Sequence, residues 1–136
     1  MSTVADDETF LQAFESCTLE NFHHRDHVRI GWLYLRAHPL LEAIGKFKTG
    51  LQRFAASKGK SEIYHETITW TFLLIIHDRL VRAAERGSDV SSWDAFAAAN
   101  TDLMTWAPSI LERYYTKETL TSPLARRLFV FPDRIG

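Results

Sequence analysis

The sequence has a single cysteine, no excess of charge of either sign and no long apolar run. Cys17 alone cannot form an internal disulfide, and no cysteine pair offers a thiolate metal site. Lysine and arginine total 16 against 17 acidic residues, so the basic face of a nucleic-acid-binding protein is not expected. The longest apolar run, residues 72–76, is far too short to span a bilayer. We therefore expect neither nucleic acid nor a membrane as a partner.

The chain also lacks signals that would divide or export it. Its first residues have neither the basic nor the apolar region of a signal peptide, which predicts a cytoplasmic protein. No stretch rich in proline, glycine or serine separates two parts of the sequence. With 136 residues, of which 46% are hydrophobic, the chain has the size and apolar content of one packed domain. We predict a single domain over residues 1–136.

Apolar residues recur at helical spacing along most of the chain. The clearest one-sided stripe consists of Leu40, Ile44, Phe47, Leu51 and Phe54. It predicts a helix that begins at Pro39 and stops at Gly59. Three more main helices are expected over residues 6–17, 24–37 and 62–86, and short ones over 92–99, from 108 and over 123–129. The predicted fold is all-α, a bundle of four main helices with short C-terminal helices.

Two of these helices carry polar residues where core residues would be expected. In the second helix, the side opposite the charged residues is centred on His27, Gly31 and Tyr34. Gly31 indicates that another helix or a ligand approaches the backbone closely. The corresponding side of the fourth helix carries Glu66, and a buried carboxylate is costly unless it is paired, hydrogen-bonded or bound to a metal. These residues predict a polar pocket between the second and fourth helices.

Four side chains form a candidate metal site. His24 and His27 are three residues apart on one helical face, so both imidazoles can reach one point. His65 or Glu66 from the facing helix would add ligands, and such a set suits a divalent metal such as zinc or iron. The alternative without a metal pairs Glu66 and His27 as catalytic acid and base.

Two further metal patterns are testable on spacing alone. A zinc-protease motif is excluded, because Thr69 stands where a second histidine would follow His65. The Glu-x-x-His spacing of di-iron bundles occurs twice, from Glu20 to His23 and from Glu62 to His65. A di-iron site also needs a lone glutamate from each of two other helices, so it stays an alternative.

The remaining candidates are substrate-binding residues. Tyr34, Tyr64 and Trp70 lie near the expected pocket along the two helices. For an anionic substrate the sequence offers three arginines: Arg113, Arg126 and Arg127. Arg126 is the arginine we assign to the pocket, and solvent-facing salt bridges are the alternative role for all three.

Several of these segments resemble a group of small uncharacterised bacterial proteins that are all-helical. The shared elements are F-x-H-x-x-H at residues 22–27, Y-H-E-T-x-T at 64–69, and A-R followed by P-D at 125–126 and 132–133. They are spread over most of the chain, and H-E-T-x-T is the most specific of them. The resemblance implies a bacterial origin and a helical fold, and it implies no particular activity.

Two classes of function are compatible with these observations. The first is a small-molecule enzyme or binding protein with a His/Glu-lined pocket, with or without a bound metal. The second is a non-catalytic interaction module or subunit, in which the buried histidines and Glu66 form a structural hydrogen-bond network. The sequence identifies neither a substrate nor a reaction.

Overall fold

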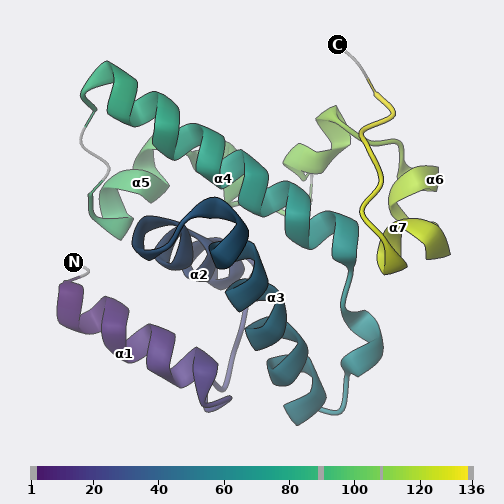
Figure 1. Ribbon diagram of the computed structural model, residues 1–136, viewed down its shortest axis with the longest axis horizontal. Coiled ribbons are helices and arrows are strands. Elements are labelled where there is room, and N and C mark those ends of the chain that lie inside the picture. The colour runs from purple at the N-terminus through teal and green to yellow at the C-terminus, as the bar shows by residue number, and fades with distance from the viewer. Residues whose placement is uncertain (1–2, 89–90, 108, 135–136) are drawn as a thin grey trace.

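The computed structural model describes residues 3–88, 91–107 and 109–134. Within these ranges the protein is all-helical and forms no β-strand (Figure 1). The α-helices are α1 (Val4–Glu15), α2 (His24–Ala37), α3 (Leu40–Ser57), α4 (Glu66–Arg86), α5 (Trp93–Ala99), α6 (Lys117–Leu120) and α7 (Pro123–Arg127). The short 3-10 helices are η1 (Ser61–Ile63), η2 (Thr101–Leu103) and η3 (Ile110–Arg113). The all-α prediction is confirmed, whereas a bundle of four main helices stays a prediction.

Local capping explains most of the helix ends. The predicted bounds of α2 are confirmed, α3 begins directly after Pro39, and α4 ends before Gly87, which adopts the left-handed conformation with φ 69°. Ser92 and Ser122 cap α5 and α7 by accepting the Ala95 and Ala125 N–H groups. None of the helices in the described ranges has both the length and the apolar character needed to cross a membrane.

Three predicted helix starts differ from the structure. The first helix begins earlier, because Thr3 and Asp6 form a capping box at 3.0 and 3.1 Å. The fourth helix begins at Glu66 rather than at residue 62, because His65 is its N-cap and η1 precedes it. The helix expected from residue 108, which lies outside the described residues, appears as the shorter η3, while α6 was not predicted.

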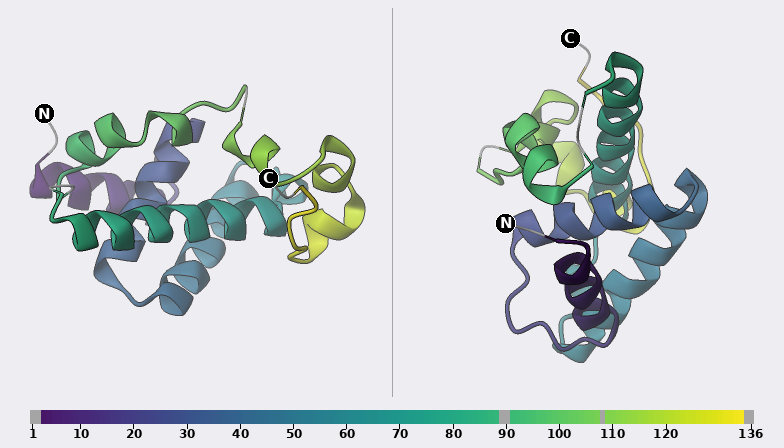
Figure 2. Two further views of the ribbon diagram at one scale, coloured as in Figure 1. Left: turned by 90° about the horizontal axis from the view of Figure 1, so that it is seen from above. Right: turned by 90° about the vertical axis from the view of Figure 1, so that its left-hand side faces the viewer.

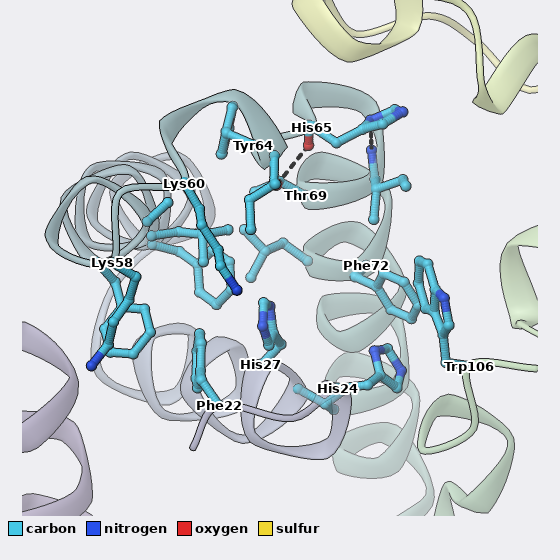
Figure 3. Close-up of a pocket in the computed structure, with 18 of the residues that line it drawn as sticks. Phe22, His24, His27, Lys58, Lys60, Tyr64, His65, Thr69, Phe72 and Trp106 are labelled. Atoms are coloured by element: carbon cyan, nitrogen blue, oxygen red, sulfur yellow. Dashed lines mark hydrogen bonds between the residues drawn. The ribbon is translucent and has the colours of Figure 1, made fainter. Parts of the chain in front are cut away.

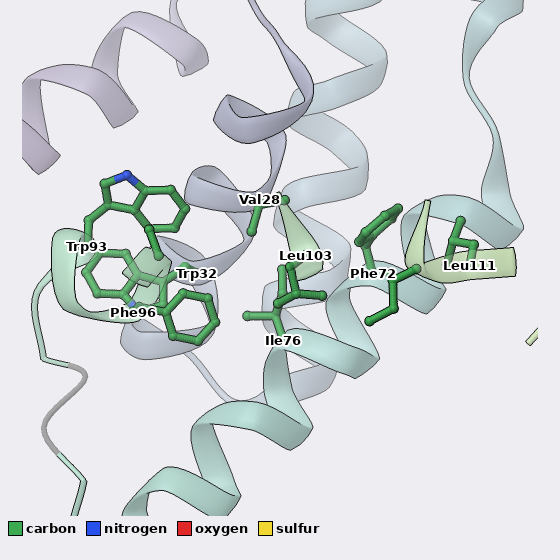
Figure 4. Packing of buried hydrophobic residues seen from close by; sticks show 10 residues of the cluster. Val28, Trp32, Phe72, Ile76, Trp93, Phe96, Leu103 and Leu111 are labelled. Atoms are coloured by element: carbon green, nitrogen blue, oxygen red, sulfur yellow. The ribbon is translucent and has the colours of Figure 1, made fainter. Parts of the chain in front are cut away.

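Helix α2 lies between two apolar clusters, with α1 and α3 on one side and α4 and α5 on the other (Figure 2). The α1–α3 cluster consists of Phe14, Ile30, Tyr34, Ala43, Ile44, Phe47, Phe54 and Leu73. The α5 cluster includes Trp32, Trp93 and Phe96, whose rings pack at centroid distances of 5.7 to 6.2 Å (Figure 4). Because α2 contributes buried residues to both clusters, packing on two opposite sides fixes its position.

Gly31 explains how closely α2 and α4 pack. A Cβ atom at this position would lie 3.0 Å from the Leu73 side chain and 3.1 Å from the Ile76 side chain. A Cβ atom at this position would require the ends of the Leu73 and Ile76 side chains to shift by a few tenths of an ångström. The close approach predicted at Gly31 is confirmed, and the approaching group is helix α4.

The C-terminal segment lies against the first turns of α4 (Figure 1). The Thr67 hydroxyl donates to the Leu128 carbonyl at 2.7 Å and accepts the Val130 N–H at 3.1 Å. The Tyr115 hydroxyl donates to the Val130 carbonyl at 2.6 Å. These bonds place α6 and α7 beside the N-terminal end of α4.

Candidate functional site

A cavity of about 820 Å³ opens where α2, α3 and α4 meet the segment 58–65 (Figure 3). Its wall is mainly aromatic and aliphatic and includes Phe22, Phe47, Leu51, Phe54, Ile68 and Phe72. A few polar side chains interrupt this wall, among them His24, His27, Tyr64 and Thr69. A mostly apolar cavity of this size with few polar groups is typical of a site for a small organic molecule.

His27 is the central polar side chain of this cavity. Its ring points into the cavity from the first turn of α2 and stacks on Phe22 at a centroid distance of 4.0 Å (Figure 3). Burial lowers the pKa of His27 to about 4, with a smaller contribution from the nearby His24, so the ring is neutral at pH 7. The Phe22 carbonyl acts on this pKa in the opposite direction, because it favours the protonated ring. A neutral imidazole has one N–H, so the second ring nitrogen keeps a lone pair for a ligand.

His24 connects α2 to the loop after α5. Its Nε2 lies 2.8 Å from the Leu103 carbonyl oxygen and therefore carries the proton of the neutral ring. The ring also packs against Phe72 and Trp106, at 4.9 and 5.2 Å between centroids. Burial lowers the pKa of His24 as well. Trp106, which is 51% exposed, forms the rim of the cavity on this side.

His65 lies at the cavity edge but uses both ring nitrogens for structure. Nδ1 accepts the Ile68 N–H at 3.1 Å, and Nε2 donates to the Leu120 carbonyl at 2.7 Å. Burial is the main cause that lowers the pKa of His65. Because neither nitrogen has a free lone pair, His65 is held as the N-cap of α4 and as a link to α6, and it is not oriented as a metal ligand.

Glu66 points toward α3. One carboxylate oxygen accepts from the Lys48 ammonium at 2.9 Å, and the other accepts from the Tyr64 hydroxyl at 2.5 Å. Burial and this hydrogen bond raise the pKa of Tyr64. Glu66 is not among the described side chains that line the cavity, so the structure does not bring it together with His27 as an acid–base pair.

The four predicted metal ligands are therefore not assembled at one point. His24, His27 and His65 line the cavity, but both ring nitrogens of His65 are bonded to backbone groups. Glu66 is bonded to residues of α3 and the preceding loop. The sequence pattern had suggested a shared site because all four residues were expected on facing helix sides. Across the described ranges, no group of three or more histidine, cysteine or acidic side chains is arranged to hold a metal ion.

Of the predicted substrate-binding residues, some line the cavity and others lie elsewhere in the fold. Tyr64 and Arg126 line the cavity. Tyr34 instead lies in the α1–α3 cluster and donates to Glu15 at 2.6 Å, and burial raises its pKa. Trp70 packs on Phe129 at 5.7 Å, away from the cavity wall.

The three candidate arginines also differ in position. One guanidinium nitrogen of Arg126 donates to the carbonyls of Glu62 and Ile63, at 3.3 and 3.2 Å, which holds it at the cavity edge. Arg113 instead pairs with Asp102 at 3.3 Å. Arg127 is exposed on α7 and is not among the side chains of the described wall.

Two functional candidates, Lys58 and Lys60, were not predicted from the sequence. They flank Gly59, whose φ of 69° reverses the chain after α3, and both line the cavity. The signal was present, because the apolar stripe of α3 ends at this glycine. When a glycine ends an amphipathic helix, the residues before and after that glycine lie at the edge of the apolar core.

The geometry defines an apolar cavity lined by the imidazoles of His24 and His27, with cationic side chains at its rim. Comparison of the chain with protein-family models, curated proteins and solved structures gives no match. What this protein binds therefore has to be inferred from the cavity itself.

Proposed function

We propose that this protein binds a small organic molecule in the cavity between α2, α3 and α4, with His27 as its main polar contact. The observation that supports this proposal is the cavity of about 820 Å³ behind a ring of aromatic side chains. In a core without a ligand these side chains would be expected to close on one another, because protein interiors are packed to the density of organic crystals. An apolar ligand would complete the contacts that the open wall lacks.

His27 is suited to orient such a ligand. Its neutral ring offers a lone pair to an N–H or O–H group, and stacking on Phe22 restricts the orientation of the ring. The same lone pair would act as a general base if the bound molecule is a substrate. Glu66 would take no part in that step, because both of its carboxylate oxygens accept hydrogen bonds, from Lys48 and from Tyr64.

The structural-network alternative is favoured for His65 and Glu66 only. Their bonds join α4 to α6 and to α3, which is the behaviour of buried polar groups that specify a fold. His24 has one ring nitrogen bonded to a backbone carbonyl, and both His24 and His27 line the cavity. We therefore assign the structural role to His65 and Glu66 and the ligand-binding role to His24 and His27.

A metal at His24 and His27 is a further part of the proposal. The bond from His24 Nε2 to the Leu103 carbonyl is the usual way in which a metal-binding histidine is oriented. Two imidazoles would leave further positions on zinc or iron for a ligand and water. Elemental analysis of protein purified without a His-tag, beside H24A/H27A, tests this. Stoichiometric metal that is lost in the double variant supports it, and no metal in either protein after reconstitution contradicts it.

The cavity itself is tested with 1-aminoanthracene, a neutral fluorescent apolar probe. Leu51 lines the cavity, whereas Leu41, on the same helix, is 75% exposed. Leu51→Trp should fill the cavity and weaken probe binding by more than about tenfold, while Leu41→Trp should bind as the wild type does. Circular dichroism checks that both variants are folded. Equal binding by the wild type and Leu51→Trp, or no binding by the wild type, would contradict the proposal.

A further inference from the structure

The cavity carries an excess of positive charge that the whole protein does not. Three cations line it, Lys58, Lys60 and Arg126, against one carboxylate, Glu20. The whole chain has a net charge of −1, so the positive charge is local. Beside an apolar wall, where water screens less, a cation attracts an anion more strongly than it would on an open surface. The cavity therefore favours a ligand that is apolar along its body and anionic at one end.

Of these three cations, Lys60 is the one available to a ligand. The Lys58 ammonium lies over the Phe54 ring at 5.3 Å, and the Arg126 guanidinium donates to two backbone carbonyls. Lys60 has no such contact with the described residues, and its side chain extends over the cavity toward His27 (Figure 3). An ammonium without a protein partner at the mouth of an apolar cavity is a suitable receptor for one negative charge.

We propose that the ligand is a monocarboxylic acid with an extended apolar body, whose carboxylate binds Lys60 at the cavity mouth. The body would then lie inside the cavity against Phe22, Phe54 and Phe72, which form its wall. This inference rests on the proposed function of the same cavity. It adds the charge of the ligand and the direction in which the ligand enters.

The surroundings of Lys60 favour a carboxylate over a phosphate. A phosphate dianion is usually held by several charged donors, commonly including a bidentate arginine. Here Arg126 is partly engaged, and the neutral ring of His27 has only one N–H beside its lone pair. One free ammonium balances one charge, and the lone pair of His27 would repel a second charge. A hydroxyl on the ligand, in contrast, could donate to His27.

The test compares probes that share one apolar chain and differ in the head group. Decanoate, decan-1-ol and decyl phosphate are titrated against 1-aminoanthracene bound to the full chain. The variants are Lys60→Met, which keeps the length of the side chain and removes its charge, and Lys46→Met, an exposed lysine of α3 outside the described wall as matched control. Wild type should prefer decanoate to decan-1-ol, and Lys60→Met should weaken decanoate by about tenfold while leaving decan-1-ol unchanged. Lys46→Met should bind all three probes as the wild type does.

The outcomes separate the two proposals. Equal affinity for decanoate and decan-1-ol, or an unchanged preference in Lys60→Met, would overturn the carboxylate assignment while leaving the cavity as a binding site. Tighter binding of decyl phosphate than of decanoate would overturn it in favour of a dianion. If neither the alcohol nor 1-aminoanthracene binds, the proposed function of the cavity fails, and this inference fails with it.

Discussion

Acidification is expected to destabilise this protein through His27. Burial lowers the pKa of this imidazole from its ordinary value of 6.5 to about 4 in the folded state. Between these two values the unfolded chain binds a proton that the folded chain does not bind. The contribution of a neutral His27 is therefore fully present above about pH 6.5, falls as the pH decreases, and stops changing below about pH 4.

The size of the effect follows from the two pKa values. Between about pH 7.5 and about pH 5, the shift of His27 corresponds to a loss of about 2 kcal/mol in the free energy of unfolding. This is an upper value, because His27 remains partly open to water through the cavity. His24 and His65 also have lowered pKa values and act in the same direction, so the wild type should lose more than the part due to His27.

Two measurements isolate the part due to His27. Urea unfolding of the wild type and of His27→Gln at both pH values gives a double difference in which the contribution of His65 cancels. The contribution of His24 cancels except for its electrostatic coupling to His27. The variant should lose up to about 2 kcal/mol less than the wild type on acidification. The NMR titration of the His27 ring should have a midpoint below about 5. A midpoint at the ordinary value or above, or the same loss in both proteins, would refute the burial of a neutral imidazole at this position.

Three further predictions concern single contacts and use urea unfolding. Gly50→Ala places a methyl group 2.6 Å from the buried Phe14 ring of α1 and should lower the free energy of unfolding by about 1–3 kcal/mol. Gly45→Ala in the same helix meets open space and should raise it by about 0.5–1 kcal/mol, and equal effects would contradict the packing of α1 on α3. Glu66→Gln should cost about 1–2 kcal/mol and leave 1-aminoanthracene binding within about twofold. A tenfold loss of binding without that loss of stability would place Glu66 in the site. Asp102→Asn should lower the free energy of unfolding by about 1–2 kcal/mol at neutral pH, because Asp102 accepts hydrogen bonds from Arg79 that also lower its pKa. This loss should become smaller as the pH falls toward the pKa of Asp102, and a loss independent of pH would contradict the pairing.

The helix ends that the sequence predicts correctly are those that depend on residues adjacent to them in the sequence. Pro39 separates α2 from α3, and Gly87 ends α4, so the sequence near each end was sufficient. The start of α4 was wrong because it depends on His65, whose Nε2 bonds to the Leu120 carbonyl more than fifty residues away. A histidine is not a usual N-cap residue, and no local pattern shows that its other nitrogen is held by α6.

The same difference explains which site residues were predicted. His27 was found because the period of α2 determines which side faces the core, and that side borders the cavity. Glu66 was assigned to the same pocket from the period of α4. However, a residue in the first turn of a helix is also within reach of the preceding loop and of a neighbouring helix. In the structure it bonds to Tyr64 and Lys48, and these contacts depend on where α3 ends.

The motif Y-H-E-T-x-T is best understood as a joint between chain segments. Its tyrosine and glutamate tie the loop before α4 to α3, its histidine caps α4 and binds α6, and Thr67 holds the C-terminal segment. The hydroxyl of Thr69 closes the first turn by donating to the His65 carbonyl at 2.8 Å (Figure 3). Each polar group of the motif is thus used by the fold, whereas the lone pair that would face the proposed ligand belongs to His27 of F-x-H-x-x-H. A substitution within the joint that abolishes binding would show that one wall of the cavity has moved. Only a loss of binding without a loss of stability, as expected for His27 and Lys60, would show contact with the ligand.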